Sequence, residues 1–199
     1  MKTLQVMVAA ALLALGLASC GSSTDSVKQA QETNEAKLDS TTTTTASADS
    51  VKDAKKDDSE FLTQAASGDM LEVQMGKEVL KRATTAGARQ AAQQMVSDHT
   101  KAGAELKALA AKKNITLLTV LGDDQQKIYN DVVTKKGAEL DKEYVKQMVK
   151  DHKDDIKEYT DASTGGTDPE VKAFAKKTVP VLQMHLSMFE KLQANMDAK

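Results

Sequence analysis

Apolar residues recur every three or four positions from Glu60 to the end of the chain, a spacing that predicts amphipathic helices. Four such patterns cover residues 60–83, 86–113, 138–161 and a last segment that begins at Asp168. The second pattern is the most regular, with steps that alternate between four and three positions. Its seam residues are Ala88, Ala92, Met95, His99, Ala102, Leu106 and Leu109. We therefore expect residues 60–199 to fold as one all-α domain.

Local signals mark the beginning of the fourth helix. Asp168 is a suitable N-cap, Pro169 fits the first helical turn, and Glu170 lies where the positive end of a helix favours an acidic residue. Pro180 removes a backbone donor further along, so it predicts a kink within this helix.

A long connection separates the second and third helices. It runs from Asn114 to Gly137 and contains a short amphipathic stretch around Ile128, Val132 and Val133, whereas the other two connections are much shorter. One short link on each side of a long one is typical of a ferritin-like four-helix bundle, in which the long segment crosses over. An up-and-down bundle with an elaborated loop is the alternative.

Residues 1–19 have the layout of a secretory signal peptide. Lys2 is the only charge before an apolar run from Val6 to Ala18, which is shorter than the roughly 20 residues that a membrane-spanning helix needs. The next residues, Leu17-Ala18-Ser19-Cys20-Gly21, resemble the lipobox of bacterial lipoproteins. That resemblance implies that Cys20 is the lipid attachment site, as in palmitate-carrying lipoproteins. The alternative is an ordinary secreted protein with a stray thiol.

The expected location follows from the same region. By resemblance to lipoprotein sorting signals, the absence of Asp after Cys20 favours the outer membrane, with the lipid anchor holding the domain in the periplasm. Cys20 is also the single cysteine, so no internal disulfide can form. Residues 20–59 are rich in Ser, Thr, Asp, Lys and Gln, and we expect them to form a disordered linker.

Composition and motifs exclude several functions. The formal net charge is −2 and aromatic residues make up 3% of the chain, which argues against nucleic-acid binding. The sequence contains no supported Ser/His/Asp set, no phosphate-binding glycine loop and no free thiol nucleophile. No catalytic residue is therefore assigned, and a non-enzymatic role is favoured.

The chain has three histidines, and all of them occupy seam positions of the expected helices. His99 and His152 each end a pentapeptide of the form Met-Val-x-Asp-His, and His185 lies midway along the fourth helix. A rise of about 1.5 Å per residue places the three at similar heights, level with Glu72 at the midpoint of the first helix. Glu72, His99, His152 and His185 are therefore the candidate ligands of a zinc or other divalent ion.

Other interpretations of these residues stay open. The histidines could be core residues that bond to carbonyls, carboxylates or water. Methionines that share a face with the histidines would suit cuprous copper, although Met at such positions more often fills the core. They are Met95, Met148, Met184 and Met188. Asp98 and Asp151 are expected to face solvent, and Asp141 is expected to cap the third helix.

Four segments carry a family resemblance. They read Phe61-Leu62-x-x-Ala65-Ala66-x-Gly68-Asp69-Met70-x-Glu72-Val73, Met95-Val96-x-Asp98-His99, Asp141-x-x-Tyr144-Val145-x-x-Met148-Val149-x-Asp151-His152 and Val179-Pro180-x-Leu182-x-x-His185-Leu186. Over residues 60–196 the chain resembles the bacterial exported proteins called domain of unknown function 4142. The resemblance implies a ferritin-like bundle without an assigned function.

The histidines depart from the pattern of di-iron ferritin-like proteins, which use Glu-x-x-His on two helices. The residues three positions before them here are Val96, Val149 and Leu182, so a di-iron centre is disfavoured. We expect a membrane-tethered envelope lipoprotein that acts as a non-enzymatic interaction or stress-related module. The alternative is an envelope protein that binds zinc or copper through its mid-bundle histidines.

Overall fold

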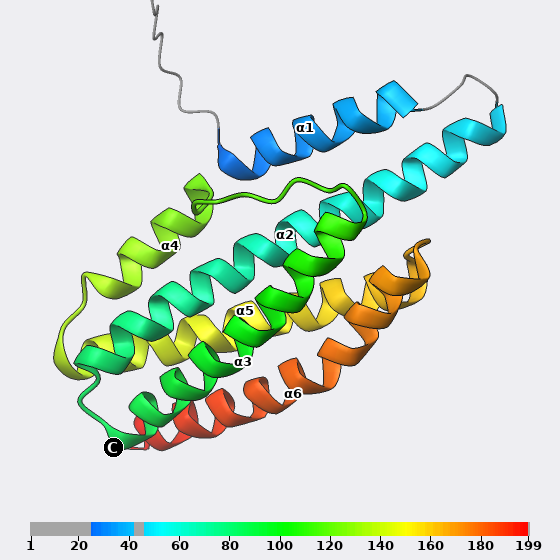
Figure 1. The fold of residues 1–199 in the computed structure, drawn as a ribbon. Coiled ribbons are helices and arrows are strands. Elements are labelled where there is room, and N and C mark those ends of the chain that lie inside the picture. Colours follow the sequence, from blue (N-terminus) through cyan, green and yellow to red (C-terminus); the bar gives the residue numbers. More distant parts are fainter. Residues whose placement is uncertain (1–24, 42–45, 199) are drawn as a thin grey trace, which may run out of the picture.

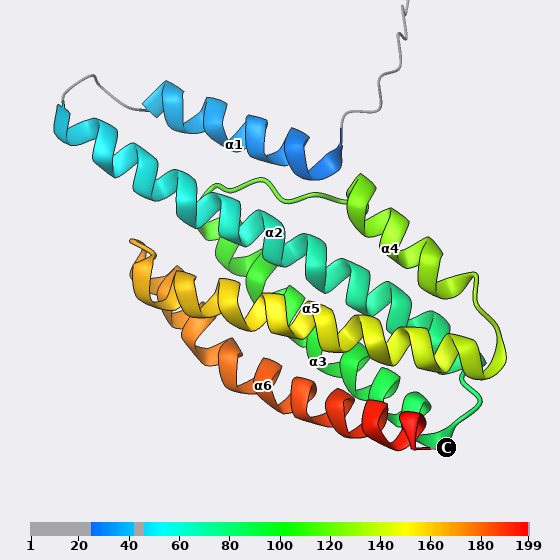
Figure 2. The same ribbon diagram turned by 180° about the vertical axis from the view of Figure 1, so that it is seen from behind.

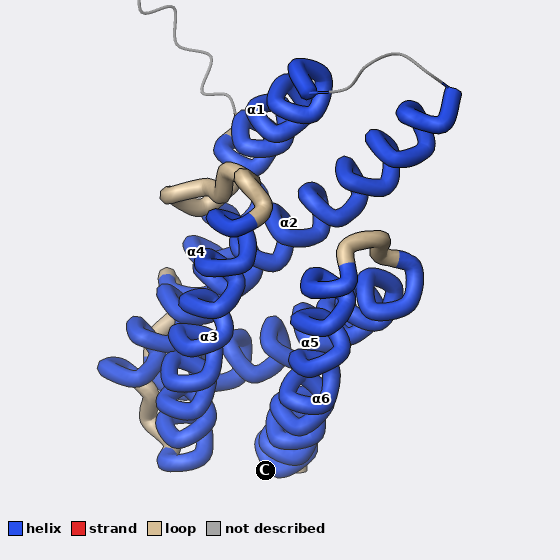
Figure 3. Tube along the Cα trace, turned by 45° about the vertical axis from the view of Figure 1, so that its right-hand side comes forward, coloured by secondary structure: helices blue, strands red, loops and turns tan. Residues whose placement is uncertain are grey.

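The computed structural model describes residues 25–41 and 46–198, and every regular element in these ranges is a helix (Figure 3). In chain order the helices are α1 (Ser26–Thr41), α2 (Ala46–Arg82), α3 (Ala86–Lys112), α4 (Asp123–Val133), α5 (Gly137–Gly165) and α6 (Pro169–Asp197). The all-α class is confirmed. The predicted signal peptide and Cys20 lie outside the described residues.

Four long helices lie side by side and account for most of the molecule (Figure 1). Helices α2 and α3 form one antiparallel pair, α5 and α6 form the other, and contacts of α2 with α5 and of α3 with α6 join the pairs. Between α3 and α5, the chain passes back along the outside through α4, which packs on α2 and α5. Helices α3 and α5 consequently run in the same direction (Figures 1 and 2).

Side-chain caps mark the beginnings of α3 and α6, and the cap of α6 is the one predicted from the sequence. Thr85 caps α3 by accepting a hydrogen bond from the backbone N–H of Ala88. Asp168 caps α6 by accepting from the N–H groups of Glu170 and Val171, at 2.9 and 3.2 Å. Helix α6 continues without interruption past Pro180. The short amphipathic stretch expected within the long connection is α4.

The core consists of two apolar clusters along the helix axes. One includes Met75, Met95, Tyr144, Met148 and Phe189. The other includes Leu62, Leu106, Tyr159, Phe174 and Leu182. On α3, α5 and α6, a histidine separates residues of the first cluster from residues of the second. The three histidines therefore form a polar layer inside an otherwise apolar interior.

The prediction of a disordered linker is wrong for residues 26–41 and 46–59, which are helical. Val27 and Ala30 of α1 are buried, and the side chain of Asn34 accepts from the N–H of Thr116 and donates to its carbonyl, at 2.7 and 2.9 Å. The segment has too few apolar residues to predict a core by itself. A narrow apolar strip and polar anchors are sufficient because α2 and the α3–α4 loop supply the complementary surface.

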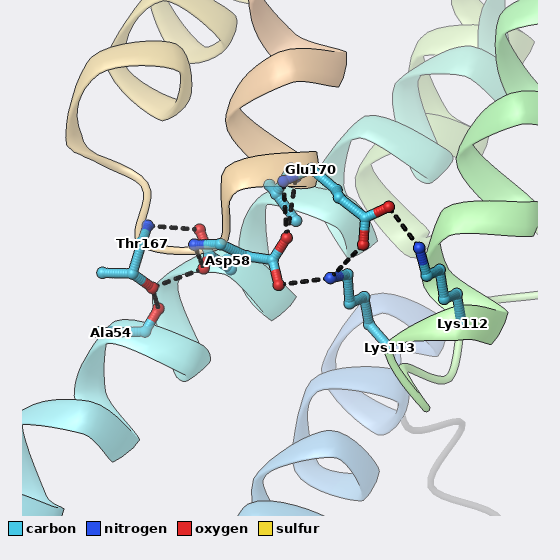
Figure 4. A network of polar contacts seen from close by, with 8 residues as sticks. Ala54, Asp58, Lys112, Lys113, Thr167 and Glu170 are labelled. Carbon is cyan, nitrogen blue, oxygen red and sulfur yellow. Dashed lines mark hydrogen bonds and ion pairs between the residues drawn. The ribbon is translucent and has the colours of Figure 1, made fainter.

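The early part of α2 is also tied to the rest of the domain. Asp58 is buried and accepts hydrogen bonds from Thr167 Oγ1 and from the N–H of Asp168, each at 2.7 Å (Figure 4). Beside it, Lys113 at the end of α3 pairs with Asp168 and Glu170, at 2.6 and 2.7 Å. This network joins α2, α3 and the α5–α6 turn, so residue 60 is not a domain boundary.

Asp141 does not cap its own helix as expected. It lies within the second turn of α5, is fully buried, and accepts hydrogen bonds from the N–H groups of Thr84 and Thr85 and from Thr84 Oγ1. These donors belong to the turn between α2 and α3, whose backbone N–H groups need an acceptor. Asp141 reaches these donors because α5 packs against the turn. The local sequence of α5 does not indicate this contact.

Within residues 25–41 and 46–198, no helix is both long and apolar enough to cross a membrane.

Candidate metal centre

The structure brings together the four residues that sequence spacing placed at one height. Glu72, His99, His152 and His185 come from α2, α3, α5 and α6 respectively, and their exposed fractions are 2%, 7%, 0% and 1%. Each of the four long helices thus contributes one buried ionisable side chain to the layer between the apolar clusters. Polar groups buried to this extent require specific partners.

The three imidazole rings are mutual neighbours. Their ring centroids are 5.9 Å apart for His99 and His152, and 5.4 Å apart for each of the other two pairs. One ligand atom from each histidine lies within 4.8 Å of those from the other two. Nitrogens around a tetrahedral ion are roughly 3.3 Å apart, so each would need to move inward by less than about 1 Å.

The outer nitrogen of each ring is held by an oxygen. Nδ1 of His99 lies 2.8 Å from Glu72 Oε2 and 3.1 Å from Asp69 Oδ1. Nδ1 of His152 donates to the carbonyl of Met148 at 2.9 Å, and Nε2 of His185 lies 2.9 Å from Asp98 Oδ2. In histidine metal sites, such outer contacts fix the ring orientation and leave the other nitrogen for the ion.

The inner nitrogens have poorer partners. Nε2 of His99 is buried and has no hydrogen-bond partner within the described part of the chain. Nε2 of His152 and Nδ1 of His185 face each other at 3.4 Å. Because Nδ1 of His152 carries a proton for Met148, its Nε2 presents a lone pair when the ring is neutral.

Asp98 and Asp69 complete the layer, although sequence reasoning assigned neither of them to it. Asp98 was expected to face solvent, but it bonds to His185 across the α3–α6 interface and is 28% exposed. The sequence signal for Asp69 is Gly103, because a Cβ atom there would collide with Asp69 Oδ2. A glycine within α3 therefore permits the carboxylate to reach His99.

Asp151 also differs from the expectation that it faces solvent. Its Oδ1 accepts from Gln147 at 2.7 Å, and its Oδ2 is buried without a hydrogen-bond partner among residues 25–41 and 46–198. Burial, together with the charge of Glu72, raises the pKa of Asp151 to about 7. Burial and Glu72 also raise the pKa of Asp155 well above its usual value.

The layer contains one ion pair and two neutral rings. Burial alone would lower the pKa of His99, but Glu72 and Asp69 outweigh it and raise that pKa to about 10. Burial alone would raise the pKa of Glu72, but the neighbouring histidines lower it to about 2. For His152 and His185, burial dominates and lowers the pKa, so both rings are neutral at pH 7.

The sequence profile of the family described as domain of unknown function (DUF4142) matches residues 40–192. The chain belongs to this family. The match begins before residue 60, in agreement with the helical structure of α2 from Ala46 onward. All of the residues in the polar layer lie within the matched range.

Two solved structures resemble this DUF4142 domain in fold. A DUF305 fragment from Deinococcus radiodurans has a TM-score of 0.62 at 10% identity, covering 70% of this chain and 96% of its own. A DUF305 protein from Streptomyces coelicolor has a TM-score of 0.62 at 14% identity, with coverages of 72% and 94%. Among curated proteins, none matches the chain. At these identities the comparisons establish a shared helical fold and no activity.

The four methionines considered for copper binding in this DUF4142 domain are divided between the core and the surface. Met95 and Met148 are fully buried in one apolar cluster, and Met188 packs against that cluster. Met184 is 52% exposed on α6. The methionines thus act chiefly as core residues, and the chemistry of the layer rests on imidazole and carboxylate groups.

Proposed function

We propose that this chain is a lipid-anchored envelope protein whose ferritin-like four-helix bundle binds a divalent metal ion through His99, His152 and His185. The observation that carries the proposal is the orientation of the three rings. Each has one nitrogen held by an oxygen, and one nitrogen of each ring lies within 4.8 Å of a nitrogen of each of the other two. An ion bound by all three would satisfy Nε2 of His99, which otherwise has no partner among the described residues.

A bound ion is energetically favourable compared with a layer of histidines that has no ion. An unsatisfied buried polar atom costs about 1–3 kcal/mol, and packing the position with an apolar side chain would avoid that cost. Nε2 of His152 and Nδ1 of His185 lie 3.4 Å apart, so these two neutral rings can share at most one weak hydrogen bond. A divalent ion would replace these poor contacts with coordinate bonds, so the arrangement is more stable when an ion is bound.

The donor set indicates which ions fit. Three imidazole nitrogens suit zinc, nickel and cupric copper, and zinc with three histidines keeps a fourth position open. Glu72 was expected to be a fourth ligand, but its Oε2 contacts the outer nitrogen of His99. For this ion Glu72 therefore orients a ligand, as outer carboxylates do in zinc sites. When bound, the ion would act as a Lewis acid at its open position.

The connectivity supports the ferritin-like assignment within this proposal. Links of a few residues join α2 to α3 and α5 to α6, while residues 113–136 carry the chain back along the molecule between the two pairs. That is the arrangement of ferritin-like bundles with one long crossover. None of the three histidines belongs to a Glu-x-x-His motif, so a di-iron role is unsuitable.

The envelope location rests on the N-terminal sequence. Residues 1–19 would be removed as a signal peptide, Cys20 would carry the lipid, and the domain would face the periplasm from the outer membrane. An interaction or stress-related module without metal is the second candidate function. The observation that favours it is the Glu72–His99 ion pair, which satisfies part of the layer without an ion.

Metal analysis of the full chain tests the proposal. The protein, purified from membranes in detergent and stripped with chelator, would be incubated with zinc, nickel or cupric ions, passed over a desalting column and analysed for bound metal. We expect retained metal in the wild type and less retained metal in His185→Ala. Gln183→Ala, an exposed change on the same helix, is the control. A wild type that retains no metal and melts identically with and without the ions would disprove the proposal.

A further inference from the structure

Glu72 has one oxygen that the three-imidazole set does not use. Its Oε2 contacts Nδ1 of His99, but Oε1 is buried and has no hydrogen-bond partner anywhere in residues 25–41 and 46–198. Nδ1 of His152 lies 3.4 Å from this oxygen. A buried carboxylate oxygen without a donor is costly, so this atom indicates a missing cationic partner.

Asp155 provides a second carboxylate beside that oxygen. It lies three residues after His152 on α5, so both side chains project from the same face of the helix. One ligand atom from each of Glu72, His152 and Asp155 lies within 4.8 Å of the other two. On the facing helix α2, residue 68 is glycine, and a Cβ atom there would lie 3.9 Å from Asp155 Oδ1.

We propose that Glu72, His152 and Asp155 form a second cation-binding subsite next to the three-imidazole set, which makes the centre dinuclear. This inference rests on the proposed function, because His152 belongs to both sites. Its Nε2 lies 3.4 Å from Nδ1 of His185, while its Nδ1 lies 3.4 Å from Oε1 of Glu72. Binding cations at both nitrogens would make His152 a bridging imidazolate: the Nδ1 proton would be released to solvent, and its hydrogen bond to the Met148 carbonyl would be lost.

The charges of the subsite support a divalent occupant. When both are ionised, the carboxylates of Glu72 and Asp155 carry like charges with little water around them. Ionising both groups without a cation is therefore unfavourable. A divalent ion between them would compensate both charges. Two carboxylates and one imidazole form a harder donor set than three imidazoles, so this subsite suits manganese, ferrous iron or zinc.

Metal stoichiometry of the full chain tests the subsite. The chelator-treated protein in detergent would be titrated with zinc and, separately, with manganese, and bound metal would be counted after desalting. Two zinc ions per wild-type chain and one per Asp155→Asn chain are expected. Asp154→Asn, an exposed neighbour on α5, should still bind two. Manganese binding should be lost in Asp155→Asn and kept in His185→Ala.

The outcomes separate this inference from the proposed function. One zinc ion in the wild type that is retained by Asp155→Asn and lost in His185→Ala would overturn the second subsite and leave the first intact. Two ions in Asp155→Asn would also overturn it. No ion in the wild type would overturn both. Asn has the shape of the protonated Asp, so circular dichroism and melting should show a folded Asp155→Asn protein against which binding can be judged.

Discussion

Nδ1 of His99 lies 2.8 Å from Oε2 of Glu72, and the two side chains meet across the α2–α3 interface with 7% and 2% of their surfaces exposed. This pair links the two proposed cation sites. Glu72 orients an imidazole of the first site through Oε2 and offers Oε1 to the second. Several consequences of substitutions in and around the pair can be measured.

Glu72→Gln should destabilise the metal-free protein. The change removes the closer of the two carboxylates that contact the buried His99 imidazolium, and losing one partner of a buried ion pair costs up to about 3–5 kcal/mol. Urea denaturation of the chelator-treated chain would measure the loss. Glu105→Gln is the control, because Glu105 is paired with Lys177 at the surface and such exposed pairs contribute little to stability. Equal effects of the two substitutions would contradict a special role for Glu72.

Stability of the metal-free protein should fall as the pH rises from about 6.5. The pKa of His99 is raised to about 10 in the folded state, so its contribution is fully present below the unfolded pKa of about 6.5 and is lost as the pH rises through 10. The expected slope is at most about 1.4 kcal/mol per pH unit. Urea titrations between pH 6 and 9 would show it.

The same titrations in Glu72→Gln provide the comparison. Without the carboxylate that contributes most to raising the pKa of His99, the slope between pH 6.5 and 9 should become shallower. If the wild type and the variant lost stability in parallel over this range, the pKa of His99 would not be the cause.

Gly103→Ala should displace Asp69 from His99, because the added Cβ atom collides with the Asp69 carboxylate. We expect a loss of about 1–3 kcal/mol from the broken hydrogen bond, partly offset by the roughly 1 kcal/mol that Ala gains over Gly in a helix. The sign should reverse in an Asp69→Ala background, where only the gain remains. A double-mutant cycle measured by urea denaturation would show this coupling.

Asn34→Ala should loosen α1 without changing metal stoichiometry. The substitution removes the two hydrogen bonds to the backbone of Thr116, which anchor α1 to the α3–α4 loop. Hydrogen exchange of residues 26–41 should accelerate by at least tenfold, as expected for the loss of about 1.4 kcal/mol. Glu32→Gln, an exposed change on the same helix, should leave exchange nearly unchanged. An unaltered exchange rate in Asn34→Ala would show that α1 is held by other contacts.

Much of the helical framework could be predicted because its signals are local. The apolar spacing of 86–113 and the Asp168-Pro169 start correspond closely to α3 and α6. In contrast, the expected start of the first helix, at residue 60, lies 14 residues after the observed start of α2 at Ala46. Residues 46–59 contain few apolar side chains, and they are held by contacts such as Asp58 with Thr167 that join distant parts of the chain.

The polar layer was likewise predictable only in part from the sequence. His99, His152 and His185 were recognisable because they replace apolar residues at seam positions, and helical geometry sets their heights. Asp98 was placed in solvent because it precedes His99 by one residue, but a side chain at the edge of an interface can reach the neighbouring helix. Helix periodicity describes a face of one helix and contains no information about what packs against its border.

The sequence by itself determined the helical class, the positions of α3, α5 and α6, and the three histidines at seam positions, because each depends on spacing along a single helix. Only the tertiary structure decided that Asp69 and Asp98 hold the outer nitrogens, that Oε1 of Glu72 and Asp155 lie beside His152, and that α1 packs on α2. Those relationships depend on the rotation and separation of neighbouring helices, which are set by side-chain packing across their interfaces.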